Sequence, residues 1–245
     1  MRKSKMTADV QPANDGMTRS TILVTGGLGF VGSHACLALL LAGYDVVVVD
    51  NLHNSDLSVL KKIQVIADLP LDFYHCDLRD DLKLNEIFDK VNPDFVMHLA
   101  GLKSVSESFD NPLEYYSVNT AGTINVLRAM TNVGCNAIVF SSSATVYGIP
   151  EYLPCDEKHP TNPTNPYGKS KLICESIIKD WVSVKETRSS VMLRYFNPVG
   201  AHESGLIGEA PQQAANNLMP VLLDVVSGRR SKLEIFGNDY DTTDG

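Results

Sequence analysis

Apolar runs of strand length alternate with segments of helical period along most of this chain. The first part of the pattern comprises Thr21–Thr25, Phe30–Gly43, Asp45–Asp50, Leu57–Ala67, Leu71–Cys76, Leu82–Val91 and Asp94–Leu99. The second part comprises a helical stretch over Pro112–Val133, a strand at Ala137–Ser141, a helix over Pro166–Val184 and a strand at Ser190–Tyr195. Such alternation is typical of a parallel sheet with helices on both faces. The pattern therefore predicts an α/β fold with a doubly wound parallel sheet.

The amino-acid composition of the sequence changes after Tyr195. A Gly/Pro/Asn-rich run begins at Asn197, and the pattern then predicts one helix at Gln213–Val226 and one strand at Leu233–Phe236. We therefore expect a Rossmann-type domain over residues 21–195 and the beginning of a smaller substrate domain over residues 196–245. Residues 1–20 have neither the apolar region of a signal peptide nor an amphipathic period, so we expect a disordered tail there.

Charge and cysteine content narrow the choice of partners and compartment. A net charge of −8 and a pI near 5.2 argue against nucleic acid and anionic membrane surfaces, because both would repel the protein. The five cysteines are scattered and form no C-x-x-C pair, which indicates buried thiols in the cytoplasm and no metal site. The longest apolar stretches fall well short of the roughly 20 residues that span a bilayer, so we expect no transmembrane helix.

A glycine-rich turn joins the first predicted strand to the first predicted helix. Gly26, Gly29 and Gly32 have the spacing G-x-x-G-x-x-G, and the same segment reads G-x-G-x-x-G from Gly27. Such a turn brings backbone N–H groups to a pyrophosphate, whose charge lies at the positive N-terminus of the helix. Because the strand, the turn and the helix occur in this order, we expect a dinucleotide site.

Two acidic residues follow the next two predicted strands. Asp50 ends the second strand, where a carboxylate accepts hydrogen bonds from the adenosine ribose and repels a 2′-phosphate, so NAD is favoured over NADP. Asp77 ends the third strand, where it either receives the adenine amino group or caps the helix before Leu82.

A tyrosine and a lysine are placed for acid–base chemistry. Tyr167 is followed four residues later by Lys171, and Asn165-Pro166 is a good helix start, so both side chains lie on one face of the predicted helix. A phenol with a pKa near 10 needs a bias of about 4 kcal/mol to become a phenolate at neutral pH. A cation at about 4 Å supplies roughly that amount. The alternative, a packed tyrosine beside an ordinary lysine, is disfavoured next to a nucleotide site.

Three serines follow the strand that ends at Phe140. Because ligands of doubly wound sheets collect at the carboxyl ends of strands, these hydroxyls are expected to reach the nicotinamide crevice. Ser143 is our candidate for the hydroxyl that bonds to the reacting sugar oxygen. For Ser141 and Ser142 we favour a simpler role, capping the next turn.

These motifs resemble the extended short-chain dehydrogenase/reductases and, within them, the UDP-glucose 4-epimerases. The resemblance runs from about Thr21 to Gly245. Further matching blocks are His98–Lys103, Pro112–Tyr116, Leu193–His202, Asn216–Pro220 and Ile235–Tyr240. Members of the family continue with the rest of a sugar-nucleotide domain, so the resemblance implies a C-terminally truncated chain and, for a full-length chain, a homodimer.

The resemblance implies reversible 4-epimerisation of UDP-galactose and UDP-glucose through a 4-keto sugar, with tightly bound NAD. Tyr167 would be the base, Ser143 would hold the oxygen, and Lys171 would bind the nicotinamide ribose and lower the pKa of Tyr167. The other cofactor contacts it implies are Gly26, Gly29, Phe30, Val31, Gly32, Asp50, Asn51, Asp77, Leu78, Lys103, Asn119 and Phe196. The substrate contacts it implies are Lys103, Ser143, Tyr167, Asn197, Asn217, Leu218 and Phe236.

Related sugar-nucleotide dehydratases have Asp-Glu after the hydroxyl residue, whereas this chain has Ala144-Thr145. Only the reversible oxidation at C4 is therefore expected. Two alternatives stay open: an epimerase of another UDP-sugar, such as a UDP-N-acetylhexosamine or a UDP-uronate, and a catalytically silent NAD-binding protein. His34 and His98 are interpreted as packed, hydrogen-bonded histidines rather than catalytic groups.

Overall fold

A single parallel sheet forms the centre of the molecule. The computed structural model describes residues 19–210, 217–235, 237 and 239. The strands are β1 Thr21–Thr25, β2 Asp45–Asp50, β3 Asp72–His75, β4 Phe95–His98, β5 Ala137–Ser143 and β6 Ser189–Tyr195. Their order is β3-β2-β1-β4-β5-β6, and every neighbouring pair is parallel. The order reverses between β1 and β4, and ligands of such sheets bind at that switch point. The predicted doubly wound sheet is confirmed.

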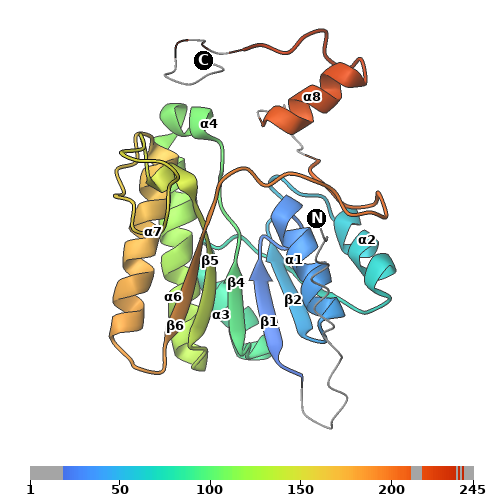
Figure 1. Cartoon of the computed structure of the whole chain (residues 1–245). Helices are drawn as coiled ribbons and strands as arrows, with labels where there is room; N and C mark the ends of the chain where they lie inside the picture. Colours follow the sequence, from blue (N-terminus) through green and yellow to red (C-terminus); the bar gives the residue numbers. More distant parts are fainter. Residues whose placement is uncertain (1–18, 211–216, 236, 238, 240–245) are drawn as a thin grey trace, which may run out of the picture.

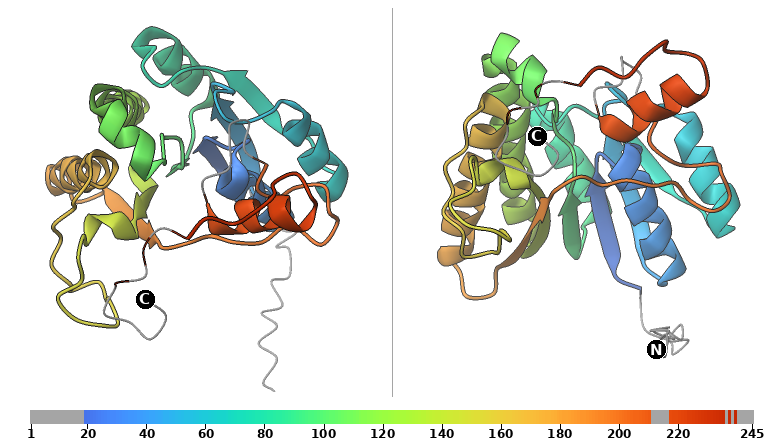
Figure 2. Two further views of the ribbon diagram at one scale, coloured as in Figure 1. Left: turned by 90° about the horizontal axis from the view of Figure 1, so that it is seen from above. Right: turned by 45° about the horizontal axis from the view of Figure 1, so that its top comes forward.

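Helices cover both faces of this sheet (Figures 1 and 2). The helices that precede β6 in the chain are α1 Phe30–Leu41, α2 Ser58–Ala67, α3 Asp81–Val91, α4 Val105–Asp110, α5 Pro112–Tyr115, α6 Gly122–Val133 and α7 Pro166–Ser183. Helices α1 and α2 pack on one face, and α3, α6 and α7 pack on the other. A π-helix, η1 Tyr116–Ala121, joins α5 to α6, and a short 3-10 helix, η2 Ala144–Val146, follows β5.

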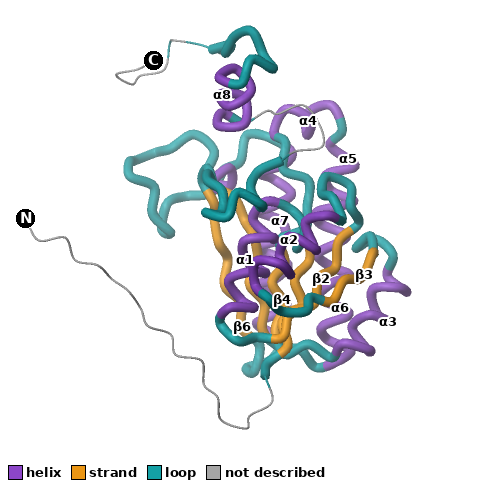
Figure 3. The backbone as a smooth tube through the Cα atoms, turned by 90° about the vertical axis from the view of Figure 1, so that its right-hand side faces the viewer, coloured by secondary structure: helices purple, strands orange, loops and turns teal. Residues whose placement is uncertain are grey.

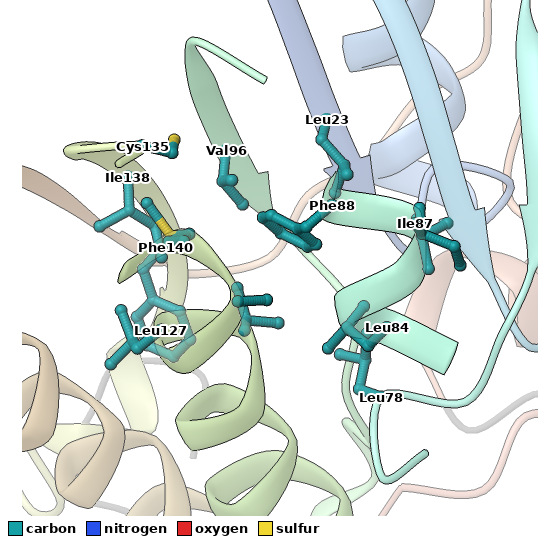
Figure 4. Packing of buried hydrophobic residues seen from close by; sticks show 14 of the residues in the cluster. Leu23, Leu78, Leu84, Ile87, Phe88, Val96, Leu127, Cys135, Ile138 and Phe140 are labelled. Carbon is teal, nitrogen blue, oxygen red and sulfur yellow. The ribbon is translucent and has the colours of Figure 1, made fainter. Parts of the chain in front are cut away.

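The two faces of the sheet bury two separate apolar clusters because side chains alternate along a strand. In β1, Leu23 belongs to the cluster under α3, α6 and α7, whereas Val24 belongs to the cluster under α1 and α2. Figure 4 shows the first cluster, to which Leu23, Phe88 and Phe140 all belong. This packing holds the carboxyl ends of the strands in a fixed arrangement.

The chain after β6 crosses the carboxyl-end side of the sheet. Ile207 is buried in the α1–α2 cluster, which attaches this segment to the far half of the sheet. Helix α8, Leu218–Val226, lies beyond the carboxyl ends of the strands (Figures 1 and 3). Within the described residues, no helix is long and apolar enough to cross a membrane.

Several predicted boundaries need correction. The helix expected over Pro112–Val133 is interrupted by η1, and neither α4 nor η2 was predicted. Residues 233–235 form no strand, because no described strand lies beside them to satisfy their backbone groups. Phe236, residues 213–216 of the predicted C-terminal helix, and residues 1–18 of the predicted tail lie outside the described residues.

Candidate active site

The glycine-rich turn between β1 and α1 brings two backbone segments into close contact. Gly26 has a φ of 68°, and a Cβ atom at this position would lie 2.7 Å from the backbone nitrogen of Ala100, so only glycine fits. Gly29 precedes α1, whose first turn carries no acidic side chain. The first N–H groups of a helix have no partner within it, and here they belong to Phe30, Val31 and Gly32. The turn is therefore suited to an anion such as a pyrophosphate.

Asp50 connects this turn to the loop after β2. Its buried carboxylate accepts hydrogen bonds from Leu28 N at 3.1 Å, Leu52 N at 2.9 Å and Ser55 Oγ at 2.8 Å. The carboxylate thus lies at the carboxyl end of β2 beside the glycine turn, where a nucleotide ribose would reach it.

Asp77 is held by a neighbouring arginine instead of capping a helix. Arg79 donates Nε and Nη2 to its two carboxylate oxygens at 2.9 and 2.8 Å, and Asn51 Nδ2 donates at 3.1 Å. The hydrogen bonds from Arg79 hold the pKa of Asp77 well below its usual range. The N-cap alternative is wrong, because Asp80 caps α3 by accepting from Lys83 N at 3.1 Å. Asp77 and Asn51 therefore form a polar pair at the ends of β2 and β3.

Helix α7 starts as predicted. Asn165 caps it by accepting a hydrogen bond from Gly168 N at 2.7 Å, and Pro166 is the first helical residue. A Cβ atom at residue 168 would lie 2.8 Å from the carbonyl oxygen of Thr145. Glycine at this position therefore lets the first turn of α7, which carries Tyr167, approach the segment after β5.

Tyr167 and Ser143 meet at this contact. Burial raises the pKa of the Tyr167 phenol, and the neighbouring Ser143 hydroxyl lowers it less strongly. The predicted lowering of this pKa by Lys171 is thus wrong for the structure as it stands, because burial of the phenol dominates. Ser143 Oγ also accepts from Thr145 N at 3.2 Å and Thr145 Oγ1 at 2.9 Å. The capping role predicted for Ser141 and Ser142 therefore belongs to Ser143.

Lys171 lies one turn further along α7 in a buried setting. Its ammonium donates to the carbonyl oxygen of Ser141 at 2.8 Å and lies 4.9 Å from the centroid of the Phe140 ring. Burial lowers the pKa of Lys171 to about 8. A Cβ atom on Gly101 would lie 3.3 Å from Lys171 Nζ, so the ammonium also adjoins the loop after β4.

Asn119 fixes that loop against α7. Its Oδ1 accepts from Leu102 N at 2.8 Å, and its Nδ2 donates to Leu102 O at 3.1 Å and to Ser170 Oγ at 3.0 Å. The side chain is buried, and both its oxygen and its nitrogen are hydrogen-bonded within the protein. Asn119 therefore holds the segment at Leu102 against α7.

The two histidines are packed as predicted. His98 is buried between Thr25 Oγ1, 2.7 Å from its Nδ1, and Thr123 Oγ1, 3.0 Å from its Nε2. Thr123 Oγ1 donates onward to Asn119 O at 2.6 Å, so His98 Nε2 carries the proton that bonds to Thr123. Burial lowers the pKa of His98 to about 3, which keeps it neutral. His34 Nδ1 lies 2.8 Å from the carbonyl oxygen of Phe30 within α1.

Two of the predicted substrate residues meet at a carboxylate that was not predicted. Glu209 Oε1 accepts from Lys103 Nζ at 2.9 Å and from Asn217 Nδ2 at 2.7 Å. The Glu209 side chain is 11% exposed, and that of Lys103 is 52% exposed. The loop after β4 and the start of α8 are thus joined across the carboxyl ends of the strands.

The remaining predicted contacts are more scattered. Phe196 is 62% exposed, with its ring 6.3 Å from that of Tyr147, and Asn197 is exposed beside it. Leu218 is exposed at the start of α8, whereas Leu78 is buried in the core. Phe236 lies outside the described residues.

Sequence reasoning missed three groups that organise this site: Glu209, Arg79 and the pair of Glu175 with Arg194. The spacing of Tyr167, Lys171 and Glu175 by four residues was a usable signal for Glu175, because it places all three on one helix face. Nothing in the sequence around Glu209 indicates its partners. No group of three or more metal-ligating side chains occurs among the residues that the structure describes.

Comparison with known proteins gives a consistent result. A family model described as GDP-mannose 4,6 dehydratase matches residues 23–245. The chain is 51% identical over 231 residues to the human UDP-glucose 4-epimerase, and 49% identical over 232 residues to the UDP-glucose 4-epimerase GEPI48 of Cyamopsis tetragonoloba. These alignments cover 91% and 94% of this chain, and the chain spans 66% of the length of each relative.

Similarity to solved structures agrees with the sequence relatives. The UDP-glucose 4-epimerase of Bifidobacterium longum, solved in complex with NAD+ and UDP, superimposes with a TM-score of 0.89 at 46% identity. The match covers 92% of this chain and 68% of that structure. The similarity therefore includes both the sheet and the segment that crosses its carboxyl ends.

Proposed function

The chain belongs to the UDP-glucose 4-epimerases of the extended short-chain dehydrogenase/reductase family, and from this membership we propose that it interconverts UDP-galactose and UDP-glucose with bound NAD. The main supporting observation is that Ser143, Tyr167 and Lys171 lie together at the carboxyl ends of the strands. Gly101 adjoins Lys171, and Ala100 adjoins Gly26 of the glycine turn. The acid–base group and the dinucleotide cradle are therefore neighbours.

The cradle fits NAD. The tight glycine turn, the first turn of α1 without acidic side chains, and the carboxylate of Asp50 correspond to the pyrophosphate and ribose sites of a dinucleotide. Asn51 and the ionised Asp77 offer polar groups for the adenine end. When bound, NAD supplies the chemistry that the side chains lack, which is reversible hydride acceptance.

The side chains supply proton transfer and orientation. Tyr167 removes the proton of the C4 hydroxyl and returns it after the 4-keto sugar has presented its other face. Ser143 adjoins this phenol, so its hydroxyl is placed to hold the same sugar oxygen. Lys171, which is anchored on the carbonyl oxygen of Ser141, is proposed to bind the nicotinamide ribose.

The segment after Ser143 favours epimerisation over dehydration, although the matching family model carries a dehydratase description. Ala144 and Thr145 follow Ser143, and neither can act as a carboxylic acid–base group. Lys103, Asn197, Asn217 and Leu218 are proposed to contact the UDP-sugar, and Phe236 is proposed for the same role. Loss of water would need a second proton donor beside the sugar, which this segment does not provide.

A second copy of the chain is proposed as the partner. Helices α6 and α7 present a groove lined by Ile124, Ile177 and Trp181, and apolar side chains of this kind favour a helix-to-helix contact. Sedimentation of the protein should give the mass of a dimer, and a monomer at micromolar concentration would contradict this part of the proposal. All five cysteines are free, which supports a cytoplasmic location.

The test of the activity is direct. The protein should convert UDP-galactose to UDP-glucose without added NAD, because the cofactor copurifies, and chromatography separates the two sugars after hydrolysis. UDP-N-acetylgalactosamine and a UDP-uronate serve as competing substrates, and exclusive turnover of either would replace the proposed substrate. Denatured protein should release NAD, and absence of NAD from folded, purified protein would refute the cofactor assignment.

A further inference from the structure

The end of β5 is attached to helix α7 at three successive residues. Each of three consecutive serines contacts a different turn of the helix. Ser141 O accepts from Lys171 Nζ at 2.8 Å, Ser142 Oγ donates to Glu175 Oε1 at 2.6 Å, and the Ser143 hydroxyl adjoins the Tyr167 phenol. Since the three helix residues are spaced by four, they lie on one face of α7. The reacting pair, Ser143 and Tyr167, is therefore one of three linked contacts.

Glu175 is the anchor among these contacts. Its carboxylate is fully buried, and besides Ser142 it accepts Nε and Nη2 of Arg194 at 2.9 and 2.8 Å. Burial by itself would raise the pKa of Glu175, but the hydrogen bonds from Arg194 and Ser142 and the charges of Arg194 and Lys179 bring it below the ordinary value. A buried carboxylate held by a two-pronged guanidinium is rigid, because losing either partner leaves an unpaired buried charge.

Arg194 extends this anchor to the other side of the reacting pair. It lies in β6, and its guanidinium stacks 4.9 Å from the ring centroid of Tyr147, which follows η2. The Tyr147 ring also packs 6.3 Å from that of Phe196, directly after β6. One ion pair thus ties together the ends of β5 and β6, the middle of α7 and the segment that follows Ser143.

We propose that Glu175 and Arg194 are positioning residues that set the separation of Ser143 and Tyr167. Neither side chain is expected to touch substrate, since Glu175 is buried and the guanidinium of Arg194 is held by Glu175 and lies over the Tyr147 ring. Their effect on turnover rests on the proposed epimerase function, but their effect on the Tyr167–Ser143 contact does not.

The kinetic test compares Glu175→Gln with Lys179→Gln. Lys179 is the other charge near Glu175, but it is exposed and lies 3.7 Å away, so it is a matched control. In Glu175→Gln we expect kcat for UDP-galactose to fall ~10- to 100-fold while KM changes less than about twofold, because misplacement of reacting groups costs rate rather than binding. Lys179→Gln should match the wild type. Unchanged kcat in folded Glu175→Gln would overturn the proposal.

Ser142→Ala provides a second test that does not depend on the folding of Glu175→Gln. It removes only the hydroxyl that joins β5 to Glu175 and leaves the ion pair with Arg194 intact. We expect kcat to fall roughly three- to tenfold with KM unchanged, since one of the three links is lost. If Glu175→Gln does not fold, wild-type kcat in Ser142→Ala would overturn the proposal.

A spectroscopic readout tests the contact without turnover. Fluorotyrosine is incorporated into NAD-free protein, and the resonance that disappears in Tyr167→Phe belongs to Tyr167. Glu175→Gln and Ser142→Ala should shift or broaden this resonance, whereas Lys179→Gln should leave it in place. An unmoved resonance in the first two variants would overturn the proposal. If the wild-type protein shows no epimerase activity, this measurement still decides the positioning role.

Discussion

Lys103 and Glu209 form an ion pair of 2.9 Å that joins the loop after β4 to the segment preceding α8. Asn217, at the start of α8, bonds to the same carboxylate oxygen at 2.7 Å. Lys103 and Asn217, both proposed to contact the UDP-sugar, are therefore bound to the carboxylate of Glu209. A diphosphate approaching this place would meet a partly neutralised lysine and a nearby negative charge.

Replacing Glu209 with Gln should strengthen the binding of UDP. The substitution keeps a hydrogen-bonding group beside Lys103 and Asn217 but removes the charge that repels a diphosphate. A charge interaction of about 1 kcal/mol at close range in water corresponds to roughly fivefold tighter binding. Calorimetric titration with UDP at low and high salt measures the effect, which should shrink as salt screens the charge.

Glu203→Gln is the matched control, because Glu203 is an exposed acid on the same segment. It changes the net charge equally but should alter UDP affinity little. Weaker UDP binding by Glu209→Gln than by the wild type would show that Glu209 holds Lys103 and Asn217 ready for the ligand instead of competing with it.

Asp50→Asn should reduce the preference for NAD over NADP. Asn keeps one acceptor oxygen, which can still serve Leu52 N and Ser55 Oγ because both donate to Oδ1, but it leaves Leu28 N without its acceptor and no longer repels a 2′-phosphate. NAD affinity should fall ~10- to 100-fold, because hydrogen bonds to a charged group are stronger than those to a neutral one. Asp45→Asn, at the exposed other end of β2, is the control. Fluorescence titration with both cofactors measures the ratio, and an unchanged ratio would mean that another residue reads the ribose.

The sheet and the site on it were largely predictable from the sequence. Strand and helix periods are local properties, and the sheet order follows from the fold class once the strands are recognised. The N-cap at Asn165 and the first helical residue Pro166 were also found correctly, because capping depends on a few adjacent residues. These sequence signals were enough to predict that Ser143 and Tyr167 lie close together.

Most of the errors concern features that depend on tertiary contacts, but Asp77 is a local one. Asp80, three residues further on, is the residue that caps α3, and Asp77 is held by Arg79 two residues away. The pKa of Tyr167 is raised or lowered according to how deeply the phenol is buried, and the spacing of residues in the sequence does not show this burial. Glu209 meets Lys103 only because the chain after β6 returns across the sheet.

Tyr167→Phe should abolish most turnover and leave NAD bound. It removes the hydroxyl that transfers the C4 proton and keeps the ring that packs against Tyr115. Loss of a general base typically costs about 10²- to 10⁴-fold in rate. Epimerase assays and the NAD content after denaturation measure the two effects. Tyr44→Phe, an exposed tyrosine far from the site, should behave like the wild type, and near-normal turnover in Tyr167→Phe would refute the assignment.

The stability of the NAD-free protein should rise with pH because of Lys171. Burial lowers its pKa from 10.5 to about 8 in the folded protein. Between these values the unfolded chain holds more protons than the folded chain, so the free energy of unfolding increases with pH in this window and the burial penalty is complete below it. Relative to Lys171→Met, the wild type should gain about 2 to 3 kcal/mol between about pH 7 and about pH 10. Urea unfolding of both variants measures the difference, in which the titration of their common tyrosines and cysteines cancels. A difference that stays constant over this range would show that the ammonium of Lys171 keeps an ordinary pKa despite its burial.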